Sequence, residues 1–167
     1  MKRIAVLFML FCFLFLLYGC GDITETGSET GTGDTQKQTE TSDSETDNIG
    51  EIKMNIKIGN KTFTATLYDN SATRELVEMM KKSPITIIMN DYGGFEKLGS
   101  LGKSLPTDNH QITTSEGDIV LYNSNQIVMF YGSNSWSYTK IGKIDDLSGW
   151  QEALGKGEIT VVFSISQ

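Results

Sequence analysis

The sequence predicts a mainly-β domain in which seven or eight short, mostly antiparallel strands close into a barrel with two short helices. Apolar and polar residues alternate in several short runs, as they do in strands with one buried face. Turns rich in Gly, Asn and Ser separate most of these runs, so neighbouring strands are linked as hairpins. Hairpin links exclude a doubly wound parallel sheet. Closure into a barrel, with the helices over its ends, removes exposed sheet edges.

The first hairpin has the clearest pattern. Residues 54–58 and 63–67 each carry apolar side chains at every second position, and Gly59-Asn60 lies between them. A two-residue turn of this composition joins antiparallel strands. We therefore expect one face of both strands in the core and the other in water.

A helix is predicted to follow. Asn70 or Ser71 can cap its N-terminus, and Pro84 prevents its continuation. Three residues at i, i+3 and i+4 form its buried stripe: Leu76, Met79 and Met80.

The run 84–90 is apolar at most positions, which predicts a strand covered on both faces. A turn follows at 91–94. Residues 95–110 are rich in Gly, Ser and Pro and are predicted to be irregular or short-stranded, with His110 in a loop.

The second half reads as further hairpins and a short helix. Strands are expected over 119–122, 126–131, 136–144 and 158–165, separated by turns at 123–125 and 132–135. The helix would be capped by Asp145 or Asp146 and ended by Gly155 and Gly157. Its apolar stripe would contain Leu147, Trp150 and Leu154.

The N-terminus has the layout of a signal peptide. Lys2 and Arg3 precede an unbroken apolar run over residues 4–18, and Cys20 follows. A run of this length fits a secretory core better than a membrane span, which needs about 20 residues. The pattern resembles the bacterial lipoprotein lipobox. The resemblance implies that residues 1–19 are removed and that Cys20 is lipidated, which would anchor the protein on the outer side of the cytoplasmic membrane. An uncleaved anchor helix is the alternative, with the same location.

Residues 20–50 are predicted to form a disordered tether. The segment 21–50 holds eight acidic residues and one basic residue, and almost nothing apolar. The domain is expected over residues 51–167, which hold 13 acidic and 11 basic residues. The acidity of the chain therefore belongs to the tether.

Several classes of function are disfavoured by composition. Cys12 lies in the signal peptide and Cys20 would carry lipid, so no thiol is left for a metal or a disulfide. His110 is the single histidine, which excludes a multi-histidine zinc site. The domain has no basic patch, so nucleic acid is not an expected partner. We predict no metal, no cofactor and no catalytic residue, and the sequence leaves the oligomeric state open.

The domain resembles the bacterial cyclophilin-like family of small barrels over nearly all of residues 53–167. The segments that carry the resemblance are 54–59, 67–72, 102–106, 117–119 and 135–144. The resemblance implies a closed cyclophilin-like β-barrel. Prolyl isomerases of the true cyclophilin family use an arginine soon after a Phe-His pair. Here the nearest run is Phe95-Glu96-Lys97, and no Phe-His-Arg sequence is present.

Aromatic residues on neighbouring strands provide a candidate binding groove. We expect it to be lined by six residues: Asn90, Phe95, Lys97, Phe130, Trp136 and Tyr138. An aromatic groove with few polar groups suits a peptide, cell-wall component or small molecule. The leading hypothesis is a membrane-anchored binding module without efficient catalysis. The alternatives are a weak extracytoplasmic peptidyl-prolyl isomerase and a purely structural domain.

Overall fold

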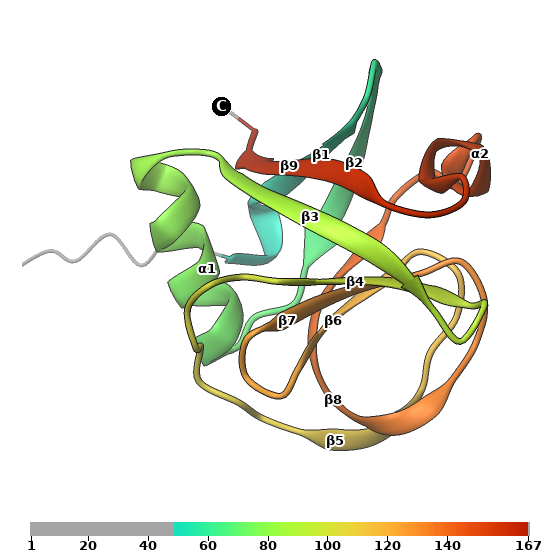
Figure 1. Ribbon diagram of the computed structural model, residues 1–167. Helices are drawn as coiled ribbons and strands as arrows, with labels where there is room; N and C mark the ends of the chain where they lie inside the picture. Colours follow the sequence, from blue (N-terminus) through green and yellow to red (C-terminus); the bar gives the residue numbers. More distant parts are fainter. Residues whose placement is uncertain (1–48, 167) are drawn as a thin grey trace, which may run out of the picture. The chain divides into compact units, whose positions relative to one another are not determined.

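The structure of the protein, a computed structural model, describes residues 49–166 (Figure 1). The predicted signal peptide, Cys20 and nearly all of the predicted tether lie outside the described residues. The elements are η1 (Ile49–Glu51), β1 (Lys53–Ile58), β2 (Lys61–Leu67), α1 (Ser71–Lys82), β3 (Ile85–Tyr92), β4 (Glu96–Ser100), β5 (His110–Thr113), β6 (Asp118–Tyr122), β7 (Gln126–Phe130), β8 (Ser135–Ile144), α2 (Trp150–Leu154) and β9 (Ile159–Ile165).

Within residues 49–166, eight strands close into an antiparallel barrel in the order β2-β1-β9-β3-β4-β7-β6-β8, with β8 returning to β2. The ninth strand, β5, pairs only with the first part of β8. This confirms the predicted fold class and adds one strand, because His110 begins β5 instead of lying in a loop.

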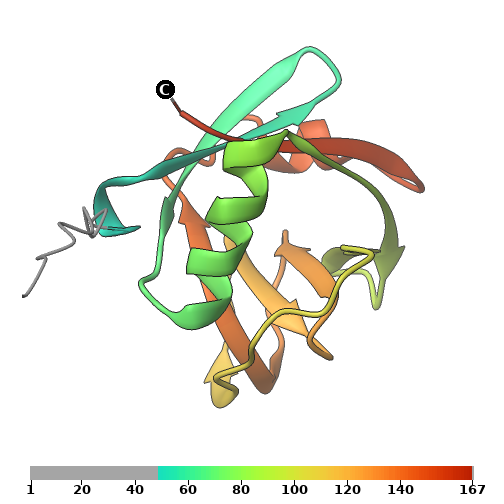
Figure 2. The same cartoon turned by 90° about the vertical axis from the view of Figure 1, so that its left-hand side faces the viewer.

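The first hairpin and the first helix form as predicted. β1 and β2 pair from Lys53↔Thr66 to Ile58↔Lys61, and Gly59 adopts the positive φ of 58° that its turn requires. Asn70 caps α1 by accepting a hydrogen bond from the backbone N–H of Thr73 at 3.0 Å. The helix crosses one side of the barrel (Figure 2), and α2 lies on the opposite side.

The prediction that the strand after α1 is covered on both faces was wrong. In β3 the odd-numbered residues Ile85, Ile87 and Met89 face the core, whereas Ile88 is 57% exposed. The barrel wall is a single sheet, and nothing in the described structure covers its outer side along this part of β3. The outer apolar side chain is therefore left in solvent.

The predicted start of the second helix was also wrong. α2 begins at Trp150 with Gly149 at its N-cap, and Leu147 precedes it at 38% exposure. Asp145 pairs with Lys53 at 3.0 Å, and Asp146 accepts from the backbone N–H of Ser148 at 2.9 Å. Asp145 therefore connects the chain to β1, Asp146 serves the turn before the helix, and neither carboxylate caps α2.

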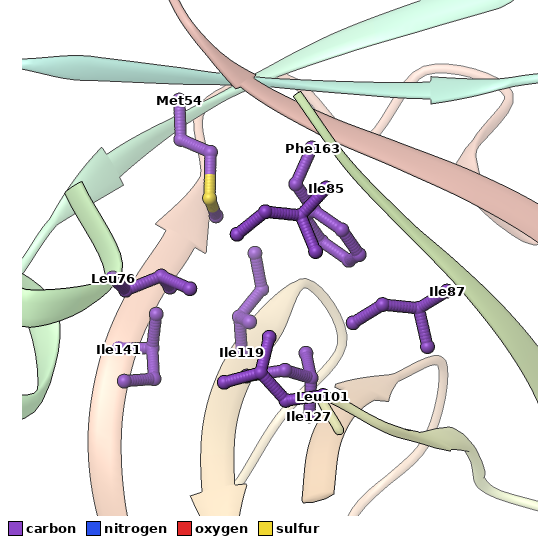
Figure 3. Close-up of a pocket in the computed structure, with 9 residues that line it drawn as sticks. All are labelled: Met54, Leu76, Ile85, Ile87, Leu101, Ile119, Ile127, Ile141 and Phe163. Carbon is purple, nitrogen blue, oxygen red and sulfur yellow. The ribbon is translucent and has the colours of Figure 1, made fainter. Parts of the chain in front are cut away.

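The barrel interior is a packed core. Figure 3 shows nine apolar side chains that point toward one another from the barrel wall, from α1 and from the segment after β4. The space among them is too narrow to admit a water molecule. A ligand site in the centre of the barrel is therefore excluded in this conformation.

The compact domain extends ahead of the boundary inferred from composition. Ile49 is 6% exposed and belongs to the main core, and its carbonyl accepts from the N–H of Ile52 at 3.1 Å. η1 thereby fixes the chain against the barrel just before β1. Among the residues the structure describes, no helix is long and apolar enough to span a membrane.

Candidate functional site

The two faces of β4 carry different chemistry. Lys97 lies opposite Asp91 of β3 and Met129 of β7, and its side chain is buried on the inner face of the wall, where Met129 belongs to the main core. Glu96 lies opposite Tyr92 and Phe130, on the outer face of the barrel. Strand alternation thus sends two neighbouring charged side chains to opposite sides of the wall.

Lys97 is a fully buried lysine with charged and polar partners. Its Nζ lies 2.7 Å from Oδ1 of Asp91 and donates to the carbonyl of Gly157 at 2.5 Å. Asp91 also accepts from the N–H of Gly157 at 2.6 Å and from the hydroxyl of Tyr131 at 3.2 Å. The Lys97 hydrogen bond is the main cause that lowers the pKa of Asp91, and the Gly157 N–H adds to it. The pair joins the β3–β4 hairpin to the turn before β9, which is a structural role.

Four aromatic rings pack together on the outer face, and we call them the outer aromatic cluster: Phe95, Tyr122, Phe130 and Tyr138. Phe95 stacks on Phe130 with centroids 6.5 Å apart and planes at 3°. Tyr138 meets Phe130 and Tyr122 edge-on at 5.7 and 6.0 Å. Phe130 and Tyr138 are buried by these contacts, so the cluster is a second small core outside the barrel wall.

Glu96 lies beside this cluster, and within residues 49–166 its Oε2 has no polar partner. The residue is 5% exposed, and its Oε2 is buried. Burial raises the pKa of Glu96 to about 7. Burial also raises the pKa of Tyr138 and of Tyr131, and the charge of Glu96 adds to both shifts. The carboxyl group therefore sits among tyrosine rings in an environment that disfavours its ionised form.

One exposed aromatic side chain borders this position, and another lies on β8. Tyr92 is 61% exposed and lies directly across from Glu96 in the β3–β4 register. Trp136 is 55% exposed and lies two positions before Tyr138 on β8. We call Glu96, Tyr92, Trp136 and the outer aromatic cluster together the outer aromatic surface.

The six residues expected to line a groove occupy three different environments. Phe95, Phe130 and Tyr138 meet in the outer aromatic cluster, whereas Asn90 and Trp136 are exposed on β3 and β8. Lys97 is separated from all of these because it points into the barrel. Sequence reasoning missed Glu96 and Tyr92 as members of the surface. The sequence signal for Glu96 is its position between Phe95 and Lys97. Neighbouring residues of a strand point to opposite faces, so an inward Lys97 places Glu96 on the outer face.

Hollows are present elsewhere on the described surface. One, of about 490 Å³, lies between the β1–β2 turn and α2, and the Lys61–Glu152 ion pair at 2.7 Å is part of its lining. Another, of about 170 Å³, is lined by Tyr68, His110 and Lys140 among others. His110 Nε2 lies 3.0 Å from Oδ1 of Asp108, and within residues 49–166 no hydroxyl group hydrogen-bonds to its ring. The arrangement of a hydrolase triad is therefore absent from the described part of the chain.

Within residues 49–166, no group of three or more His, Cys, Asp or Glu side chains lies close enough to hold a metal ion.

The comparison with family models agrees with the barrel. A family model described as the cyclophilin-like family matches residues 56–164. No curated protein matches the sequence. Among solved structures, the solution structure of a hypothetical protein from Archaeoglobus fulgidus is similar, with 17% sequence identity and a TM-score of 0.48. That match covers 69% of this chain and 95% of the archaeal chain.

Proposed function

The chain belongs to the cyclophilin-like family, and we propose that it is a membrane-anchored binding protein whose outer aromatic surface takes up a peptide or small ligand without efficient catalysis. The observation that carries the proposal is Glu96, whose buried Oε2 has no hydrogen-bond partner among the described residues and which lies beside the exposed ring of Tyr92.

The outer aromatic surface contains a buried polar atom, Oε2 of Glu96, that has no hydrogen-bond partner among the described residues. Buried polar atoms in folded proteins nearly always have a partner, and an exception calls for an explanation such as a bound ligand. Tyr92 exposes a large aromatic side chain beside it and Trp136 exposes another on β8, and exposed aromatic residues are typical of recognition surfaces. The barrel interior has no space for a ligand, which leaves the outer wall and the surface hollows.

The proposed location rests on the N-terminal pattern. A cationic start, a short apolar run and Cys20 support secretion followed by lipidation. The acidic segment 21–50 would then hold the barrel away from the headgroups.

A weak prolyl isomerase is the alternative. Rotation about a prolyl bond faces a barrier of about 18–20 kcal/mol, so catalysis needs a fixed donor aimed at the twisted amide. Lys97, the basic residue nearest to the expected position in the sequence, points into the barrel and is bound to Asp91 and Gly157. Arg74 on α1 is bound to Asp69 through two hydrogen bonds. Binding without efficient isomerisation is therefore the better-supported function.

Residue-specific mapping tests the binding site. Blocked pentapeptides of the form acetyl-Gly-Gly-X-Gly-Gly-amide, with X as lysine, arginine, norleucine, phenylalanine, proline or glutamate, would be titrated into the detergent-solubilised, isotope-labelled full chain. We expect amide shifts centred on Tyr92, Glu96 and Trp136 for at least one peptide. Shifts confined to the hollow between the β1–β2 turn and α2, or no shift with any peptide, would contradict the proposal. Catalysis of proline isomerisation at the rate of an efficient isomerase would favour the alternative.

A further inference from the structure

We propose that the outer aromatic surface recognises a cationic side chain, the lysine or arginine of a basic peptide, and that Glu96 accepts its hydrogen bond. This inference rests on the proposed function and specifies the ligand class of the same surface.

Within residues 49–166, Oε2 of Glu96 lacks a hydrogen-bond donor. No ion pair among residues 49–166 involves Glu96, and its Oε2 has no hydrogen-bond partner. The nearest lysine in sequence, Lys97, is held on the opposite side of the wall by Asp91. A cation from another molecule would supply both the charge and the donor that this carboxyl group lacks.

Aromatic side chains border Glu96 on the outer face of the barrel. Tyr92 lies across from Glu96 on β3, and Tyr138 is close enough for the charge of Glu96 to act on its hydroxyl. Aromatic faces attract ammonium and guanidinium groups, more strongly where water is excluded. A carboxyl group beside several rings is thus suited to an organic cation.

Anionic and apolar ligands fit this surface less well than a cation does. An anionic group would meet a carboxyl group with no cation beside it, which disfavours binding. An apolar side chain would pack on the rings but would leave Oε2 of Glu96 without a donor. A lysine or arginine side chain satisfies both requirements, since its apolar stem can lie along Tyr92 while its head reaches the carboxyl group.

A ligand must also be able to reach the buried carboxyl group of Glu96. Tyr92 is 61% exposed, so its ring can move without opening the core. The turn beside it contains Gly93 and Gly94, both with positive φ, at 60° and 78°. The partly exposed Phe95 is the other boundary of the site. A flexible side chain end can therefore approach Glu96 with local rearrangement alone.

Saturation-transfer difference NMR on the full chain in detergent micelles tests the inference with the same blocked pentapeptides. Saturation should pass to the ε-methylene protons of lysine and the δ-methylene protons of arginine. The lysine peptide should bind more tightly than the norleucine peptide, which has a similar stem without the charge. Glu96→Gln should weaken the lysine peptide roughly tenfold, the loss expected when a charge-assisted hydrogen bond is removed. It should leave the norleucine peptide unchanged.

Two further variants complete the design. Glu51→Gln removes the same charge from an exposed position in η1 and should leave binding unchanged, which excludes a general effect of net charge. Tyr92→Leu should weaken the lysine peptide more than the norleucine peptide. Equal affinities for lysine and norleucine peptides, or an unaltered affinity in Glu96→Gln, would overturn the inference and leave the proposed function intact. An absence of binding by every peptide would overturn both.

Discussion

Nζ of Lys97 lies 2.7 Å from Oδ1 of Asp91, and the lysine is completely buried while the aspartate is one-third exposed. The lysine occupies the inner face of β4 at the end of the barrel. Its second partner, the carbonyl of Gly157, belongs to the turn before β9. One buried side chain thereby connects the β3–β4 hairpin to the last strand.

Removing one partner of this pair should be costly. We expect Asp91→Ala to lower the free energy of unfolding by roughly 3–5 kcal/mol, because it leaves Lys97 as a buried charge without its counter-ion. The double variant Lys97→Met with Asp91→Ala should recover most of that loss. Urea denaturation monitored by circular dichroism measures both, and a loss below about 1 kcal/mol in Asp91→Ala would show that the pair is not stabilising.

The stability of the domain should depend on the ionisation of Glu96. Burial raises its pKa from 4.5 to about 7, so the fold favours the protonated form. Stability is therefore fully present below pH 4.5 and declines as the pH rises through about 7. The full shift corresponds to at most about 3 kcal/mol, since one pKa unit equals about 1.4 kcal/mol.

The variant Glu96→Gln isolates this effect. The difference in unfolding free energy between variant and wild type should grow in favour of the variant from pH 4.5 to pH 8. Denaturation at matched pH values tests this. A difference that stays constant over the range would mean that the carboxyl group is not desolvated in solution.

The segment before β1 should contribute to stability. Ile49 is buried against the main core, so Ile49→Ala should cost about 2 kcal/mol, the lower end of the range for large-to-small core substitutions. Glu51→Ala, an exposed position in the same turn, serves as the control and should change little. Thermal melts of both variants provide the comparison, and indistinguishable midpoints would show that η1 is not docked.

The barrel could be predicted from sequence because its signals are local. Alternation over 54–58 and 63–67 and the Gly59-Asn60 turn each specify one hairpin without knowledge of the rest of the chain. The exposure of Ile88 could not be predicted in this way, since an apolar run does not reveal that nothing covers its outer face.

The candidate site depends on register, which the sequence does not show directly. The run Phe95-Glu96-Lys97 does not indicate which charged side chain enters the barrel. Lys97 enters because Asp91 lies opposite it on β3 and Gly157 offers a carbonyl at the barrel end. Glu96 is then forced outward against the aromatic rings. The orientations of Lys97 and Glu96 therefore depend on contacts with segments that are distant in the sequence, the turn before β9 and β7.

Membrane anchoring should depend on Cys20. If lipidation attaches the protein to the membrane, Cys20→Ala should move it from the membrane fraction to another fraction of the cell or to the medium. Fractionation with detection of the barrel domain measures this. A Cys20→Ala protein that remains in the membrane fraction, processed as before, would contradict the lipoprotein assignment.

The ligand-binding surface is tested most directly by the fluorescence of Trp136. The chain has two tryptophans, of which Trp136 is 55% exposed and Trp150 is fully buried, with its Nε1 donating to the carbonyl of Phe130 at 3.0 Å. Acrylamide should therefore quench mainly Trp136, and a bound pentapeptide should protect it. Trp136→Phe should abolish the change, while Leu147→Ala, which removes another exposed apolar side chain, should preserve it. Unaltered quenching at saturating peptide, or protection that persists in Trp136→Phe, would contradict the account.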